Sequence, residues 1–222
     1  VALKNVEASS ITFEADETLY LGAGTEVAVA ATKSYVCQLL ALYILAKACV
    51  GQRVSKGEIT RVANCARDIC AVSLYEDKIK KAKLFFIGKG IDFVTAQEGS
   101  LKFKEITYKM PDAYQAGELK HGTIALVDGK SVVIVVATNG KDKERIEASV
   151  SELKSRGAYV IAIESIGETG ANKTYELPRI SDELLLPVLS VIPLQSLALT
   201  ASLCLGLDPD KPRNLAKSVT VI

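Results

Sequence analysis

Three charged residues at helical spacing are the first candidates for chemistry. Glu98, Lys102 and Glu105 lie four and three positions apart in a stretch with a helical pattern, so their side chains project from one stripe of a helix. Two carboxylates beside one ammonium can place a base next to a cation that stabilises an enolate. The spacing alone favours a simpler interpretation, a surface ion pair worth about 0.3 kcal/mol.

The single histidine is a second candidate acid or base. His121 lies in a polar loop, residues 117–122, with a glycine at each end. A lone histidine is more often structural or solvated than catalytic, but functional groups concentrate in loops at the ends of a rigid sheet. One histidine also excludes a multi-histidine metal centre.

The C-terminal segment mixes apolar residues with Arg213 and Lys217. Frayed termini are generally polar, so we expect this segment to dock on a surface. Lys217 lies between small and apolar neighbours, where a desolvated amine becomes a nucleophile. A solvated lysine on a docked strand explains the pattern equally well.

A glycine-containing turn, Gly88-Lys89-Gly90, is a candidate phosphate cradle because it follows a strand-like run and leads into a helix. A dinucleotide-binding fingerprint is absent, since Phe93 stands where the third glycine belongs. Asp92 also places a negative charge where an anion would lie. The pattern favours a tight turn and a helix N-cap.

Short apolar runs and helical stretches alternate in the second half of the chain. The runs are rich in β-branched or aromatic residues and indicate strands buried on both faces: residues 82–87, 131–138 and 158–163. Helices are predicted at residues 92–110 and 142–156, the second ending at Gly157. This order predicts an α/β fold with a parallel sheet and helices on both faces.

The first part of the chain contains too little for a domain with its own core. Two helices are predicted at residues 32–49 and 57–72, and strand-like pieces occur between residues 10 and 21. We expect residues 1–54 to be the trailing part of one domain, residues 55–207 a second domain, and residues 208–222 an extended tail. The chain has no initiator Met, so we expect it to begin inside something longer.

Composition excludes several classes of protein. The 27 basic and 26 acidic residues leave no net field that would attract nucleic acid, and 49% hydrophobic residues exclude disorder. The five cysteines form no CxxC pair and indicate reduced core residues of a cytoplasmic protein. Residues 184–207 carry no charge, but Pro187, Pro193 and several polar residues favour a buried helix with a proline kink over a membrane span.

Three motifs resemble the isomerase region of the glucosamine-6-phosphate synthases, which are glutamine:fructose-6-phosphate amidotransferases. They are residues 97–106 (QEGSLKFKEI), 116–122 (AGELKHG) and 212–221 (PRNLAKSVTV). Residues 23–33 also resemble the end of the first of the two sugar isomerase (SIS) domains on which that family is built. The resemblance covers nearly the whole chain. Its terminal motif is specific, since SIS domains of sugar-sensing regulators share the fold but lack that tail.

The resemblance implies a role for each candidate. The carboxylate matching Glu105 shuttles a proton between C1 and C2 of the sugar, and the lysine matching Lys217 forms a Schiff base with the open-chain ketose. The histidine matching His121 assists ring opening in the site of the partner subunit, which implies a homodimer. Lys102 and Glu98 match residues that support the base. Further substrate-binding candidates are Val29 and Ala216, through their backbones, together with Thr32 and Arg213.

The sequence also departs from the family pattern. It lacks the family's N-terminal glutaminase domain, whose terminal Cys is a nucleophile that Val1 cannot replace. It also lacks the leading half of the first SIS domain, which in the family carries Ser/Thr-rich phosphate-binding loops. Thr32 and Ser34 are a weak remnant of those loops. Thr123 stands where the family usually has proline after His-Gly. We therefore expect the chemical groups to be present while much of the substrate anchor is missing.

Together these features predict the isomerase portion of the synthase, converting fructose 6-phosphate and ammonia to glucosamine 6-phosphate. A glutaminase domain outside this chain would supply the ammonia. Neither a metal nor an organic cofactor is expected, because proton transfer next to an imine requires only a base, an acid and a cation. No nucleic acid or membrane partner is expected. The alternatives are a non-catalytic SIS module that binds a phosphosugar and signals, and a related SIS ketosamine deglycase.

Overall fold

A five-stranded parallel sheet forms the centre of the fold. The computed structural model describes residues 1–72 and 75–217, and the sheet has the strand order β4-β3-β5-β6-β7. Every neighbouring pair in it is parallel, so all five strands end at the same edge. The strands are β3 (Lys83–Gly88), β4 (Asp112–Gln115), β5 (Ser131–Ala137), β6 (Tyr159–Glu164) and β7 (Lys173–Glu176).

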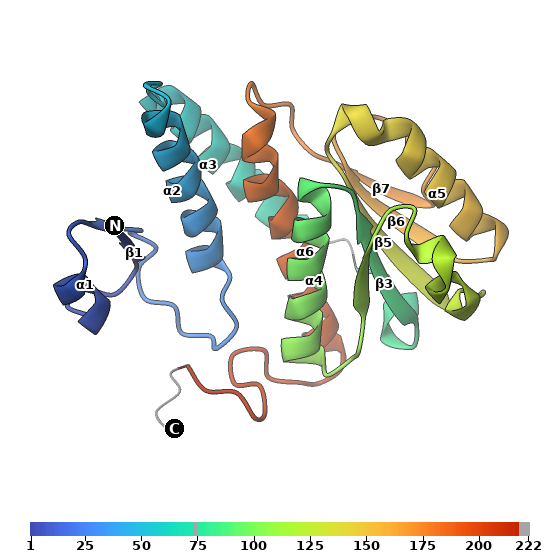
Figure 1. The fold of residues 1–222 in the computed structure, drawn as a ribbon. Helices are drawn as coiled ribbons and strands as arrows, with labels where there is room; N and C mark the ends of the chain where they lie inside the picture. The colour runs from blue at the N-terminus through green and yellow to red at the C-terminus, as the bar shows by residue number, and fades with distance from the viewer. Residues whose placement is uncertain (73–74, 218–222) are drawn as a thin grey trace.

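Helices cover both faces of this sheet, which confirms the predicted α/β class with three layers (Figure 1). Alternate strand residues face opposite sides, as in any strand. Phe86 and Ile134 pack in one core with α4 (Ile91–Thr107) and α6 (Leu186–Cys204). Val133 and Val135 pack in the other core with α5 (Lys143–Ser155).

Two further helices, α2 (Lys33–Cys49) and α3 (Lys56–Cys70), pack on the α6 side. The side chain of Ser55 accepts a hydrogen bond from the Glu58 amide and caps α3. The buried Tyr43 hydroxyl of α2 lies 3.1 Å from a Glu58 carboxylate oxygen and 2.9 Å from one of Asp182. These contacts tie α2 to α3 and to the segment that precedes α6.

Helix α6 is the most apolar element of the fold, and its interior is buried as the sequence predicted. Residues Glu183–Cys204 are long and apolar enough to cross a membrane by length and composition, yet 72% of this span's apolar window is buried inside the protein. Pro187 occupies the first turn of α6, where no amide donor is needed, and Pro193 lies inside the helix. In this fold the segment is a core helix.

The turn between β3 and α4 is the tight turn and helix start that the sequence favours, with Gly90 at the N-cap and a positive φ of 58°. The Asp92 carboxylate is buried and accepts bonds from the hydroxyl and the amide of Thr138 and from the Asn139 amide. Burial raises the pKa of Asp92, and the bonds from Thr138 and Asn139 oppose that rise. Asp92 therefore joins the carboxyl ends of β3 and β5.

The N-terminal segment differs from the prediction in one element. Residues Ser10–Glu14 form a short helix, α1, where the pattern indicated a strand. Both the amide and the hydroxyl of Thr12 donate to the Ser9 carbonyl, and such local bonds favour a turn over a strand. The strands β1 (Ala2–Lys4) and β2 (Thr18–Tyr20) form a separate parallel pair.

The cysteines were predicted to lie in the core, and this is wrong. All five are free, Cys37 and Cys65 are partly exposed, and Cys49, Cys70 and Cys204 are exposed. The three exposed ones are the last residues of α2, α3 and α6. Side chains at these helix ends face solvent, so an apolar sequence around a cysteine does not bury its thiol.

We predict that Gly99→Val lowers the free energy of unfolding by about 2 kcal/mol, because overpacking a filled core forces side chains and backbone to move. A Cβ atom on Gly99 would lie 2.8 Å from Leu194 Cδ1 and 3.1 Å from Phe86 Cε1, between α4, α6 and β3. Urea unfolding followed by circular dichroism measures the change. Gly57→Val is the matched control, because the nearest atom to its Cβ would lie 3.9 Å away. Equal stability of the two variants would contradict this account of the α4–α6 contact.

Candidate active site

Lys102, the centre of the charged triad on α4, is buried, and its two carboxylate partners are partly exposed. Lys102 Nζ lies 2.7 Å from Glu105 Oε2 and 3.3 Å from Glu98 Oε1. The side chains of Lys102 and Glu98 are 5% and 10% exposed, and that of Glu105 is 22% exposed. The surface ion pair that the spacing favoured is therefore wrong. An ammonium with so little solvent requires charged partners, and the two carboxylates supply them.

The triad holds two carboxylates in different electrostatic settings. Burial raises the pKa of Glu98, Lys102 opposes the rise, and the neighbouring Glu105 charge adds to it. Glu98 therefore binds a proton more readily than an exposed glutamate. Glu105 has the shorter contact with the shared cation and the more exposed side chain. This arrangement leaves Glu105 as the more accessible base, with a fixed positive charge beside it.

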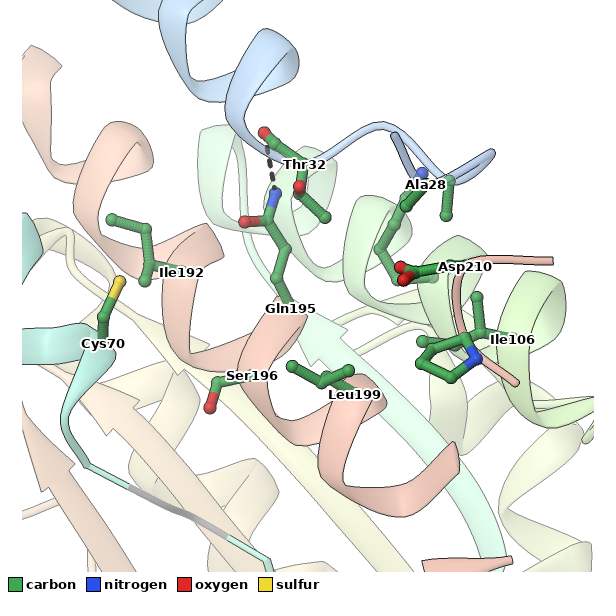
Figure 2. A pocket seen from close by; sticks show the side chains of 12 residues that line it. Ala28, Thr32, Cys70, Ile106, Ile192, Gln195, Ser196, Leu199 and Asp210 are labelled. Atoms are coloured by element: carbon green, nitrogen blue, oxygen red, sulfur yellow. Dashed lines mark hydrogen bonds between the residues drawn. The ribbon is translucent and has the colours of Figure 1, made fainter. Parts of the chain in front are cut away.

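A cavity of about 300 Å³ opens between the triad helix, α6 and the segment that leads into α2 (Figure 2). Apolar groups make up most of its wall, and Lys102 is the buried charge that reaches it. Gln195 of α6 donates to the Thr32 carbonyl over 3.4 Å across this space. The lining residues are Ala28, Ala30, Thr32, Cys70, Lys102, Ile106, Ile192, Gln195, Ser196, Leu199, Pro209 and Asp210.

Glu26, which was not among the predicted site residues, organises the segment on the rim of this cavity. Its carboxylate accepts bonds from the Thr32 amide at 2.9 Å, the Ser34 amide at 3.2 Å and the Ser34 hydroxyl at 2.7 Å. Burial raises the pKa of Glu26, but these bonds and the contact with Lys217 outweigh it and lower the pKa to about 2. Glu26 is therefore a fixed anion at neutral pH.

The tail docks beside the same segment, as the sequence predicted. The Val29 amide donates to the Asp210 carbonyl over 3.2 Å. The Lys217 amine donates to the Ala28 carbonyl over 2.6 Å and lies 3.2 Å from the Glu26 carboxylate. Its side chain is 46% exposed, so the desolvated lysine that its neighbours suggested is not what the structure has. The rest of that motif, residues 218–222, lies outside the described residues.

The other predicted residues lie apart from the triad. His121 is exposed and lines a different cavity, with Lys89, Lys120 and Arg145. The Arg213 guanidinium lies 4.3 Å from the centre of the Tyr108 ring, and the Arg213 amide donates to the Tyr108 hydroxyl. This stacking holds the tail in place, and Arg213 does not line the cavity.

Ala216 is exposed and also lies outside the cavity lining. Within the residues that the structure describes, no group of three or more His, Cys, Asp or Glu side chains could hold a metal ion.

Little in the sequence pointed to Glu26 or Gln195. Glu26 lies in the stretch that resembles the end of a first SIS domain, but its partners are two backbone amides and one hydroxyl, which a motif does not show. Gln195 is one polar residue in the apolar α6. The only hint in the sequence was a polar residue inside an apolar helix, because a buried polar side chain needs a hydrogen-bond partner.

Comparison with known proteins agrees with this geometry. A family model described as SIS domain matches residues 79–204. The glutamine–fructose-6-phosphate aminotransferase (isomerizing) of Caldanaerobacter subterraneus subsp. tengcongensis is 42% identical over 242 aligned residues, which cover 100% of this chain and 39% of that protein. The protein of the same name from Clostridium tetani is 41% identical over 239 aligned residues, with the same coverage. The chain thus spans well under half the length of these relatives.

Two solved structures share the fold at an identity that supports relationship. The C-terminal domain of glucosamine-fructose-6-phosphate aminotransferase from Francisella tularensis has a TM-score of 0.77 and 28% identity, covering 93% of this chain and 63% of that one. Glucosamine-6-phosphate deaminase from Thermotoga maritima has a TM-score of 0.81 and 27% identity, covering 98% and 65%.

The matched family model spans more than half of the chain, and relatives at about 40% identity cover all of it. The resemblance expected from the three motifs is therefore confirmed. The sheet with helices on both faces is the fold of the two solved structures. By these findings the chain belongs to the SIS domain family.

Proposed function

We propose that this chain is the isomerase portion of a glutamine–fructose-6-phosphate aminotransferase. In this proposal it converts fructose 6-phosphate and ammonia to glucosamine 6-phosphate in the cytoplasm. The names of the relatives that match the whole chain support it, and so does the partial coverage of those relatives. A glutaminase domain elsewhere in the full enzyme would release the ammonia.

One observation carries the proposal. The docked tail brings the Lys217 amine to the Ala28 carbonyl and the Glu26 carboxylate, and Ala28 is also part of the wall of the cavity that Lys102 reaches. Lys102 of the triad thus lines a space of about 300 Å³, and the Lys217 amine contacts Ala28 of the same wall, while Glu98 and Glu105 lie behind Lys102 outside the lining. A phosphosugar-binding module needs neither group, whereas imine chemistry with proton transfer needs both.

Each group has a role in this proposal. After its ammonium loses a proton, the Lys217 amine attacks the C2 carbonyl of the open-chain ketose and forms an imine with loss of water. Ammonia then adds to C2 and displaces the Lys217 amine, so that the imine nitrogen on C2 comes from ammonia. Glu105 moves a proton between C1 and C2, while the Lys102 ammonium stabilises the negative charge that develops. Glu98 fixes Lys102. The carboxylate of Glu26 has a pKa of about 2, so it holds the Lys217 ammonium in place rather than taking its proton.

The N-terminal region supports the proposed domain division. The two-stranded parallel pair β1–β2 carries exposed apolar side chains, Leu19 at 42% and Tyr20 at 54%, and Phe13 of the intervening α1 is 80% exposed. Parallel sheets are normally covered on both faces, so a pair of this kind belongs at the edge of a larger sheet. We therefore propose that residues 1–54 complete a first SIS domain, that residues 55–207 form the second, and that residues 208–222 are the catalytic tail.

The remaining substrate contacts are part of the same proposal. Thr32 lines the cavity, and Val29 and Ala216 present their backbones beside Lys217 in the two segments that meet at the rim. The sugar phosphate would be gripped mainly by the leading half of the first SIS domain. His121, in its separate cavity, would act in the site of a second copy of the chain, which makes the functional unit a homodimer.

We predict that the chain forms glucosamine 6-phosphate from fructose 6-phosphate and ammonium, and that Lys217→Ala abolishes both product and borohydride trapping of a ketose adduct. The reason is that the variant lacks the amine that forms the imine. Product assay and intact-mass measurement after borohydride reduction report the two effects. Lys211→Ala, another lysine of the tail, is the matched control. Trapping that persists in Lys217→Ala would remove Lys217 from this role.

If a folded wild-type chain forms no product, one further experiment is needed. The assay is then repeated on a chain extended at its N-terminus, which adds the proposed phosphate anchor. Activity in the extended chain supports the proposed domain division. Continued inactivity with intact phosphosugar binding would instead favour the non-catalytic SIS module.

We predict that Glu105→Gln slows exchange of the C1 and C2 hydrogens by about 10²- to 10⁴-fold, because the amide cannot accept the proton. Sugar ring opening should continue in this variant. Proton NMR in deuterated water follows the exchange, and Glu144→Gln, at an exposed position of α5, is the control. Exchange at the wild-type rate would exclude Glu105 as the base.

The homodimer is tested by subunit complementation. His121→Ala and Lys217→Ala chains are each expected to be inactive, and an equal mixture of refolded chains should recover roughly a quarter of wild-type activity. Half of the dimers are then mixed, and each has one complete site. Sedimentation velocity should show dimers at micromolar concentration. A monomeric chain, or a mixture without recovered activity, would contradict the shared site.

A further inference from the structure

A third cavity lies at the amino-terminal edge of the sheet, where β5, β6 and β7 begin. Its volume is about 650 Å³, and its charged lining residues are all exposed lysines: Lys78, Lys81 and Lys130. No aspartate or glutamate is among the described residues that line it. The rest of the wall includes Gly129, Gly157, Tyr159 and Asn172.

The carboxylates nearest in sequence are engaged elsewhere or lie outside the cavity. Asp128 pairs with Lys83 at 2.7 Å and accepts the Lys130 amide at 2.9 Å. Glu76 pairs with Lys173 at 2.7 Å. Asp77, the next residue along, does not line the cavity. In the described part of the chain, the amines of the three lining lysines therefore have no counter-ion within 4.0 Å.

Two polar groups of the wall are already held in position. The Lys78 amine lies 3.9 Å from the centre of the Tyr159 ring, a cation–π contact that orders it without neutralising it. The Asn172 side-chain oxygen accepts from the Val160 amide at 2.8 Å, and the Asn172 amide donates back to the Val160 carbonyl at 2.9 Å. Among the described residues, the side-chain NH₂ of Asn172 has no partner and is a further donor.

Two glycines bring main chain into the wall. A Cβ atom on Gly157, which has a φ of 88°, would lie 3.3 Å from the Gly129 Cα atom. The loops before β5 and before β6 therefore approach each other closely, and side chains at these positions would fill the space between them. Glycine at both positions keeps side chains out of this part of the wall.

We propose that this cavity binds the polyphosphate group of a small molecule, either free pyrophosphate or the tail of a nucleotide. Three ammonium groups match the charge of a diphosphate, and lysine binds phosphate as a flexible point charge. The volume is within the range of small-ligand sites. The cavity is at the amino-terminal edge of the strands, so it is separate from the cavity that Lys102 reaches.

Isothermal titration of the 222-residue chain with pyrophosphate and with ATP tests this proposal. Both ligands should bind with one site per chain. Lys78→Gln and Lys130→Gln should each weaken pyrophosphate binding by about tenfold, since each removes one charge-assisted contact. Lys80→Gln is the matched control, because it removes the same charge from the same short segment, Asp77–Lys80, at an equally exposed position that does not line the cavity. Thermal unfolding verifies that all variants fold.

The measured affinities distinguish a pyrophosphate site from a nucleotide site, and they also show whether the proposal fails. Equal affinity for pyrophosphate and ATP identifies the polyphosphate as the whole recognition element, and tighter ATP binding adds the nucleoside. No binding, or an equal loss of affinity in Lys80→Gln, would overturn the proposal as diffuse attraction to surface lysines. The readout is binding, so it is independent of whether the chain converts a sugar.

Discussion

The buried ammonium of Lys102 is the constraint on which the candidate active site depends. A charge 5% exposed is stable only if carboxylates stay beside it, so Glu98 and Glu105 must remain on the same face of α4. That face is held by α6, which packs against Gly99 through Leu194 and donates from Ser202 to the Ile106 carbonyl at 2.8 Å. The apolar helix and the charged triad therefore specify each other's position.

A second anion, Glu26, connects segments that are far apart in the sequence. It binds the start of α2 through Thr32 and Ser34, and it meets Lys217 of the tail. The Val29–Asp210 hydrogen bond joins the same two segments. The first and last parts of the chain thus form one wall around a cavity whose other walls are α4 and α6. Neither segment has regular structure at that wall, so these few polar contacts define its shape.

The buried centre of the fold could be predicted because its signals are local. The strands β3, β5 and β6 are apolar runs, and the helices between them have clear starts and stops. The edge strands β4 and β7 are four residues each, DAYQ and KTYE, and half-exposed edges carry little apolar pattern. The burial of Lys102 could not be read from spacing, because it is set by packing against α6, about ninety residues away in the sequence.

The strand order places the topological switch point between β3 and β5, where open α/β sheets commonly bind ligands. Here the chain fills that position itself, since the Asp92 carboxylate takes the Thr138 and Asn139 amides at the ends of these strands. An anion bound there would have to displace a buried carboxylate from three donors. The space available for chemistry lies instead on the α4–α6 side of the sheet, between these helices and the docked tail.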